Sequence, residues 1–165
     1  MLGVVDLFIR RAVPDDVTTL HRFVIELAAA EDFPCTVEAT PDDLAEALFG
    51  TRPVAEAIVA TIDGEPAGFA LYYLAYSTIL GRPTLHLEDL YVSPAARNNG
   101  LGVALFQHLS AEAVARGCGR FEWWVLHQRR RDPLLPPSGR TNSRRDPGDA
   151  PRRRGTQASR QRPVT

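Results

Sequence analysis

Hydrophobic and polar positions between residues 6 and 126 follow two spacings, one typical of strands and one typical of helices. Alternating or continuous apolar runs predict strands over Asp6–Ala12, Ala55–Ile62, Pro66–Tyr76, Thr84–Val92 and Arg120–Leu126. The dipeptide Asp63-Gly64, between the second and third of these runs, is typical of a tight hairpin turn. The chain therefore contains five predicted strands, two of which are joined as a hairpin.

Helical spacing of apolar residues predicts three helices. The first follows Pro14–Asp16, whose acids lie at the positive end of the helix dipole, and its apolar face falls within Leu20–Leu27. The second runs over Thr40–Gly50, with Thr40 as its cap, and the third covers Gly100–Ala115. The order β-α-α-β-β-β-α-β predicts an α/β fold in which helices flank a mixed central sheet.

Charge divides the chain after residue 126. All 19 basic residues are arginine. Residues 1–126 carry 8 Arg and 17 Asp or Glu, a net charge of -9, whereas residues 127–165 carry 11 Arg and 3 Asp, a net charge of +8. The second segment is also rich in proline and poor in apolar residues, so it cannot bury enough surface to offset the entropy of ordering. We predict a folded domain over residues 1–126 and a disordered Arg/Pro-rich tail over residues 127–165.

Length and composition exclude several classes of protein. A chain of 165 residues has room for one domain with a real core. No apolar run approaches the ~20 residues of a membrane span, and residues 1–6 do not form a signal or transit peptide. The two cysteines, Cys35 and Cys118, are too few for a disulfide framework or a zinc site. We therefore expect a cytoplasmic protein with no membrane partner and no metal.

A glycine-bearing loop, Arg97–Gly102, opens the third predicted helix. Its glycines let backbone N–H groups approach a ligand closely, and these groups together with the helix dipole make an anion site suited to a pyrophosphate. Alone, the pattern R-x-x-G-x-G fits a simple helix-entry turn equally well. Here it follows a strand and a Val-x-Pro sequence, Val92–Pro94, and that combination is much more specific.

In this region the sequence resembles the GNAT N-acetyltransferase superfamily, and within it the diamine (spermidine/spermine) N-acetyltransferase branch. The similar segments are Phe8–Arg10, Glu26–Glu31, Gly68–Tyr73, Leu87–Val92 and the loop Arg97–Gly102, and together they span roughly residues 7–126. The resemblance implies a GNAT fold and direct transfer of an acetyl group from acetyl-CoA to a primary amine. It implies that Leu90, Tyr91 and Val92 hold the pantetheine arm through their backbone, and that Arg97, Asn98, Asn99, Gly100, Leu101, Gly102 and Val103 cradle the pyrophosphate.

For the acceptor side, the resemblance points to Arg22, Glu31, Asp89, Glu122, Trp123 and Trp124 around the bound amine, and to Glu88 as the general base. An acidic groove attracts and orients a polyamine, which is cationic along its length. The amine must also lose a proton before it attacks, and a carboxylate beside another carboxylate is suited to that role. Because adjacent strand residues point to opposite faces, we expect only one of Glu88 and Asp89 to face the cleft directly.

Each candidate also has a purely structural interpretation. Glu31 could simply be a charged residue at a helix end, and the two tryptophans could be core or sheet-face aromatics. His86 and His108 are most simply structural. The alternative functions are acetylation of an amino acid or a protein amine, or a catalytically inactive CoA-binding or interaction module with a basic tail. Members of this family commonly dimerise, so a homodimer is also expected.

The tail departs from the family pattern. That pattern continues after the last strand with an Asn, then Ala-Ile-x-Phe-Tyr and Leu-Gly, and its tyrosine protonates the leaving thiolate. The chain has Arg131–Arg140 there, with no Phe or Tyr beyond Leu126. One permissible coding of those ten residues, read one base later, gives Ala-Ile-Arg-Phe-Tyr-Arg-Arg-Leu-Gly. We therefore predict a frameshift after about residue 126, an incomplete domain and impaired activity, in preference to a genuine nucleic-acid-binding tail, which would favour aromatic residues for stacking.

Overall fold

Five strands form one sheet in the computed structural model of the chain, which describes residues 6–31 and 36–124. The strands are β1 (Leu7–Arg11), β2 (Glu56–Ile62), β3 (Glu65–Ser77), β4 (Arg82–Val92) and β5 (Arg120–Trp123), and they lie side by side in chain order. Successive strands from β1 to β4 pair antiparallel, whereas β4 and β5 pair parallel. The predicted mixed sheet is therefore confirmed.

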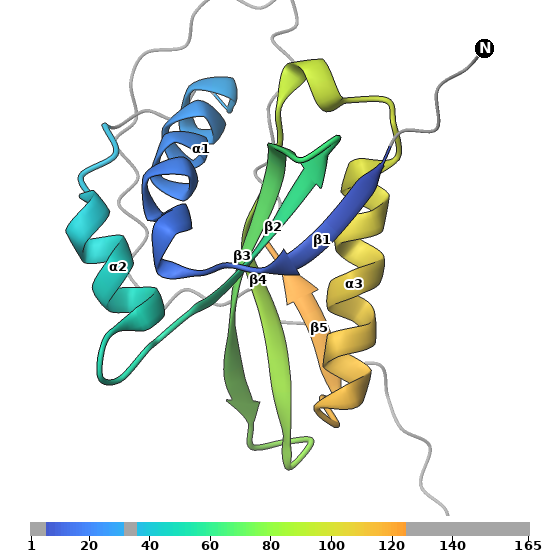
Figure 1. Cartoon of the computed structure of the whole chain (residues 1–165). Coiled ribbons are helices and arrows are strands. Elements are labelled where there is room, and N and C mark those ends of the chain that lie inside the picture. The colour runs from blue at the N-terminus through green and yellow to red at the C-terminus, as the bar shows by residue number, and fades with distance from the viewer. Residues whose placement is uncertain (1–5, 32–35, 125–165) are drawn as a thin grey trace, which may run out of the picture. The chain divides into compact units, whose positions relative to one another are not determined.

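Three helices cover the two faces of this sheet. They are α1 (Val17–Ala30), which follows a short 3-10 turn at Pro14–Asp16, α2 (Pro41–Phe49) and α3 (Leu101–Ala115). Figure 1 shows α1 and α2 on one face and α3 on the other. In the described part of the chain, no helix is long and apolar enough to cross a membrane.

The predicted cap of α2 is present in full. The Thr40 hydroxyl accepts a hydrogen bond from the Asp43 backbone N–H at 3.2 Å, and the Asp43 carboxylate accepts one from the Thr40 backbone N–H at 2.8 Å. This reciprocal pair satisfies donors that the first helical turn cannot satisfy itself. The hairpin turn is also as predicted, since Asp63 and Gly64 both have positive φ, 51° and 84°, as a tight β2–β3 connection requires.

Apolar side chains fill one core on each face of the sheet. The core under α3 contains Leu101, Leu105 and Leu109 of that helix packed on Ile58, Ala60, Ala70, Tyr72, Leu85 and Leu87 of the sheet. The core under α1 and α2 contains Leu20, Phe23 and Leu48 packed on Ala57, Val59, Phe69 and Tyr91. Each large side chain buried in this way stabilises the fold by about 1.5–3 kcal/mol. The sheet is thus fixed from both sides and can position a site on β4.

An ion-pair network ties the C-terminal end of α3 to the sheet. The Arg116 guanidinium donates to both carboxylate oxygens of Glu56 on β2, at 2.6 Å to Oε2, and to Glu112 Oε1 at 2.6 Å. The Tyr72 hydroxyl donates to Glu56 Oε2 at 3.3 Å. Hydrogen bonding from Arg116 lowers the pKa of Glu56, and burial next to Glu56 raises the pKa of Tyr72 to about 12.

Three of the sequence predictions lie outside the described residues. They are the tail over residues 127–165, the motif that a frameshift would have displaced, and the last two residues of the predicted strand Arg120–Leu126.

Candidate active site

A β-bulge in β4 sets the position of the two adjacent carboxylates. Leu71 of β3 pairs with Asp89, but the next residue of β3, Tyr72, pairs with Leu87, so Glu88 is an extra residue in β4. As a result Leu87 and Leu90, three positions apart, both pack against the α3 core. Glu88 and Asp89 both line one cavity. Simple alternation does not hold across a bulge, so the reason for expecting only one of them to face the cleft does not apply here, and both residues border the same cavity.

The pairing of β4 with β5 ends at the bulge. Parallel pairing between β4 and β5 runs from Thr84 opposite Arg120 to Leu87 opposite Trp123 and goes no further. From Glu88 to Val92, β4 is therefore paired only with β3 among the described strands. Its outer backbone N–H and C=O groups can bind an extended ligand in the manner of an added strand.

A cavity of about 350 Å³ lies at this divergence, within the usual size range for a small-molecule site. We call it the acidic pocket; its lining consists of Leu27, Glu31, Leu87, Glu88, Asp89, Leu90, Phe106, Trp123 and Trp124. Three of these side chains are carboxylates, and none is Arg, Lys or His. The lining therefore combines negative charge with apolar and aromatic surface.

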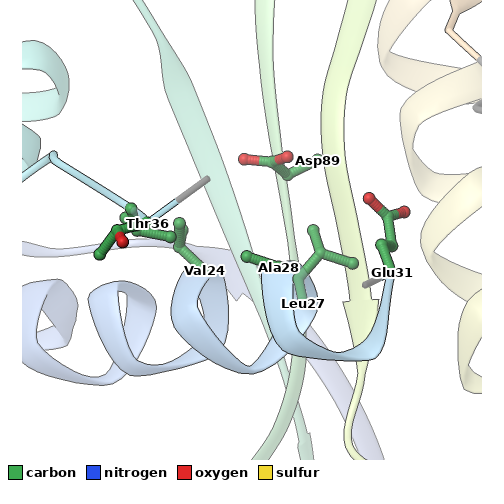
Figure 2. Close-up of a pocket in the computed structure, with 7 residues that line it drawn as sticks. Val24, Leu27, Ala28, Glu31, Thr36 and Asp89 are labelled. Atoms are coloured by element: carbon green, nitrogen blue, oxygen red, sulfur yellow. The ribbon is translucent and has the colours of Figure 1, made fainter. Parts of the chain in front are cut away.

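A second, smaller cavity of about 180 Å³ shares Leu27, Glu31 and Asp89 with the acidic pocket. Figure 2 shows the Glu31 carboxylate, from the residue that follows α1, and the Asp89 carboxylate, from β4, on the same side of α1. Leu27 of that helix lies between them in the view. Two carboxylates from different elements thus border one apolar surface.

Burial and neighbouring charge both act on Asp89. Desolvation, followed by the charges of Glu88 and Glu31, raises the pKa of Asp89 to about 6. Glu88 itself is more accessible, with about half of its side chain exposed, and its Oε2 lies 3.7 Å from His86 Nε2. The acidic pocket therefore contains one half-buried carboxyl, Asp89, with a raised pKa, and one more open to solvent, Glu88.

A groove of about 370 Å³ lies at the start of α3, where the sequence predicts a pyrophosphate site. Its lining residues are Val92, Ala96, Arg97, Asn98, Gly100, Leu101, Gly102 and Val103. The turn requires left-handed backbone at Asn98 and Gly100, whose φ angles are 65° and 78°. The first hydrogen bond of the helix runs from the Ala104 N–H to the Gly100 carbonyl at 3.0 Å, so the N–H groups of residues 101–103 precede the helical ladder and can bind an anion.

The structure brings most of the predicted site residues together in two places. Glu31, Glu88, Asp89, Leu90, Trp123 and Trp124 line the acidic pocket, and Val92, Arg97, Asn98, Gly100, Leu101, Gly102 and Val103 line the groove. Tyr91 is buried under α1, which leaves its backbone for ligand contact, and Asn99 is not among the residues lining the groove. The predicted cofactor and acceptor sites thus lie at the two ends of Glu88–Val92, the segment of β4 that pairs only with β3 among the described strands.

Two predicted residues lie elsewhere. Arg22 pairs with Glu26 at 3.3 Å and its guanidinium lies over the Phe23 ring, outside the lining of the acidic pocket. Glu122 lies beside His86 and pairs with Arg120 at 3.2 Å. Their roles toward the acceptor stay predictions.

The sequence did not single out Leu27, Leu87 and Phe106 as pocket residues. Leu27 and Phe106 lie on helices and Leu87 on a strand, and the spacing of apolar residues in these elements does not show which of them border a cavity instead of packing in the core.

Comparison with known proteins agrees with this geometry. The model of the Acetyltransferase (GNAT) family matches residues 20–132. The chain belongs to the GNAT acetyltransferase family. It is therefore an N-acetyltransferase, whose co-substrate is acetyl-CoA. The groove at α3 and the unpaired edge of β4 fit such a molecule, because one offers backbone donors to a pyrophosphate and the other an extended edge to the pantetheine arm.

Relatives of this GNAT acetyltransferase confirm the diamine acetyltransferase branch. It is 35% identical over 126 residues to the thialysine N-epsilon-acetyltransferase of Sus scrofa, covering 72% of this chain and 74% of that protein. It is 31% identical over 125 residues to the spermidine/spermine N(1)-acetyltransferase-like protein 1 of Homo sapiens, covering 72% of this chain and 18% of that protein. The ribosomal-protein-alanine N-acetyltransferase of Brucella melitensis biovar Abortus 2308 shares the fold, with a TM-score of 0.63 at 22% identity over 75% of this chain and 84% of that one.

Proposed function

We propose that this GNAT acetyltransferase acetylates a primary amine of a small cationic acceptor, a diamine or a lysine-like amino acid, bound in the acidic pocket. One observation carries this proposal: Glu31, Glu88 and Asp89 line one pocket whose lining includes no basic side chain. Like charges gathered in a partly dry site are unfavourable, and a bound cation relieves that cost. The names of the thialysine and spermidine/spermine relatives agree with an acceptor of this class.

Each carboxylate has a distinct role in the proposal. Glu88 lies at the bulge, where the pairing of β4 with β5 has ended, and accepts the proton of the attacking amine, directly or through a water molecule. Asp89 and Glu31 hold a cationic group of the acceptor and orient it. Acetyl-CoA, when bound, supplies the activated thioester carbonyl. The chain's own work is then to bind the amine, remove its proton and hold it against the edge of β4.

We further propose that this chain is less active than a frame-corrected version of it. The family's general acid is a tyrosine that follows the last strand, and the sequence has no tyrosine after Tyr91. A homodimer and a cytoplasmic location stay predictions. Exposed apolar side chains at the β3–β4 hairpin, among them Tyr76 and Ile79, support self-association.

The experiment is a thiol-release assay with acetyl-CoA and a panel of acceptors: a diamine, spermidine, thialysine, a neutral amino acid and a basic peptide. Turnover with the small cationic amines alone supports the proposal. Turnover only with the peptide favours the protein-amine alternative. Acetyl-CoA binding without any turnover, for this chain and for the frame-corrected chain, favours the inactive-module alternative.

A further inference from the structure

His86 lies in the middle of β4, beside Leu87 and Glu88 of the acidic pocket, and its position in the sequence alone indicates no more than a structural role. Only 5% of the residue is exposed. Its ring contacts the Tyr73 ring, from the paired position of β3, at a centroid distance of 4.8 Å, and the Trp124 ring lies at 6.1 Å. The imidazole is therefore held in place by aromatic neighbours on two sides.

The two ring nitrogens face two carboxylates. Nε2 lies 3.7 Å from Glu88 Oε2, and Nδ1 lies 3.8 Å from Glu122 Oε1 of β5. In the described part of the chain, Nε2 of His86 is the only buried side-chain nitrogen or oxygen that lacks a hydrogen-bond partner. A buried polar atom left without a partner destabilises the fold by about 1–3 kcal/mol, so its retention in this position needs an explanation.

The charged and titratable groups around the ring are Glu88 on its own strand, Tyr73 on β3 and Glu122 on β5, with Arg120 paired to Glu122. Desolvation, followed by the charges of Glu88 and Glu122, raises the pKa of the Tyr73 hydroxyl. Negative groups therefore predominate around the imidazole. Nε2 thus faces one carboxylate and Nδ1 faces another, so both ring nitrogens lie beside groups that can exchange a proton.

We propose that His86 is a positioning residue that takes up, through Glu88, the proton lost by the attacking amine; this inference rests on the proposed function. The N–H bond of the ammonium group breaks and its proton binds the Glu88 carboxylate. Glu88 then passes that proton to His86 Nε2 and is a carboxylate again while the amine attacks. After the product leaves, the proton returns through Glu88, which is half-exposed, to water. No electron transfer and no further reactant are needed.

The test compares wild-type protein with His86→Gln, and with His108→Gln as the matched control on the exposed face of α3. The readout is kcat/KM for a diamine as a function of pH, from neutral pH to above the pKa of the free amine. At neutral pH His86→Gln is expected to lose roughly tenfold, because a proton-transfer group is commonly worth at least that much. The loss should narrow as pH rises, because the ammonium group then loses its proton in solution and the enzyme no longer has to remove that proton before attack. His108→Gln should match the wild type throughout.

A purely structural role for His86 predicts a different result, namely a loss of the same size at every pH or no loss at all, and either result overturns the proposal. Unchanged acetyl-CoA binding and circular dichroism show that the variant folds. Should His86→Gln fold poorly, Glu122→Gln, at a half-buried position, is the second variant. It is expected to show a smaller deficit in kcat/KM that also narrows with rising pH, and a uniform deficit would overturn the proposal as well. If the wild-type protein acetylates no amine, both the proposed function and the role of His86 are overturned. If the wild type is active and the variant loses the same factor in kcat/KM at every pH, only the role of His86 is overturned.

Discussion

Glu31, at the end of α1, and Asp89, on β4, line the same two cavities, and the charge of Glu31 helps to raise the pKa of Asp89 to about 6. The two residues come from elements 58 positions apart in the sequence, so the fold has brought like charges together. Such an arrangement costs stability and is retained where function needs it. A cationic acceptor would supply the missing positive charge.

Asp89→Asn should lower kcat/KM for a diamine at pH 7 by roughly tenfold or more, because one lost charge interaction of about 1.4 kcal/mol is already a factor of ten. In the wild type, activity should fall as pH drops through about 6, since protonated Asp89 no longer attracts the cation. The Asp89→Asn variant should not show this fall in activity near pH 6. Asp42→Asn, on the exposed first turn of α2, is the control and should keep the wild-type profile.

The same substitution should stabilise the protein near neutral pH. The folded-state pKa of Asp89 is raised above its unfolded value of 3.8, so the folded state binds more protons between pH 4 and 6 and stability falls as pH rises through that window. Asparagine cannot ionise, so it removes the cost of charging residue 89 in the folded state. A pKa of about 6 in place of 3.8 corresponds to a cost of up to about 3 kcal/mol at neutral pH. Urea unfolding at pH 7 and pH 4 measures it: the variant should gain stability at pH 7 and little at pH 4. A variant less stable than the wild type at pH 7 would contradict the account of Asp89.

Gly102→Ala should separate stability from cofactor binding. A Cβ at Gly102 would meet only the Val92 side chain, at 3.8 Å, so the fold accommodates it, and alanine in place of glycine stabilises a helix by about 0.5–1 kcal/mol. The added methyl group would, however, lie among the N–H groups that approach the pyrophosphate. We expect a higher Tm. We also expect roughly tenfold weaker acetyl-CoA binding by calorimetry, because the loss of one N–H contact to the pyrophosphate would cost about 1.4 kcal/mol. Ser110→Ala, farther along α3, should leave binding unchanged; unaltered affinity in Gly102→Ala would place the pyrophosphate elsewhere.

Arg116→Gln should destabilise the fold by about 1–3 kcal/mol, because it breaks charge-assisted hydrogen bonds to Glu56 and Glu112 that are largely shielded from solvent. Arg116 lowers the pKa of Glu56, so this contribution is present above the unfolded value of 4.5 and is lost as pH falls below it. Chemical unfolding at pH 7 and pH 3 should therefore show a large difference between wild type and variant at pH 7 and a small one at pH 3. Arg52→Gln, an exposed position, is the control, and an equal effect of both substitutions at pH 7 would contradict the assigned role of the network.

Much of the fold could be predicted from local signals. The Thr40 cap with Pro41 fixed the start of α2, the Asp63-Gly64 turn fixed the β2–β3 hairpin, and helical spacing gave α3 within one residue of its observed start at Leu101. These features depend on residues close together in the sequence, where one residue type is strongly favoured by the backbone.

The site was less predictable because it depends on register between strands. The extra residue at Glu88 is visible only once Leu71 is paired with Asp89 and Tyr72 with Leu87, and no local pattern marks it. The environment of His86 likewise comes from β3 and β5, which contribute Tyr73 and Glu122. Family resemblance supplied the identity of the carboxylates, and the fold supplied their arrangement.

The central claim is that a pocket formed by Glu31, Glu88 and Asp89 binds a cationic amine for acetylation. Its most direct test measures thiol release from acetyl-CoA with a diamine and with a neutral monoamine of the same length. Measured at pH 7.5 on the frame-corrected chain and its Asp89→Asn variant, the account predicts a strong preference of the unsubstituted chain for the diamine and loss of most of that preference in the variant. Equal kcat/KM for the two amines, or an undiminished diamine preference in Asp89→Asn, would contradict it.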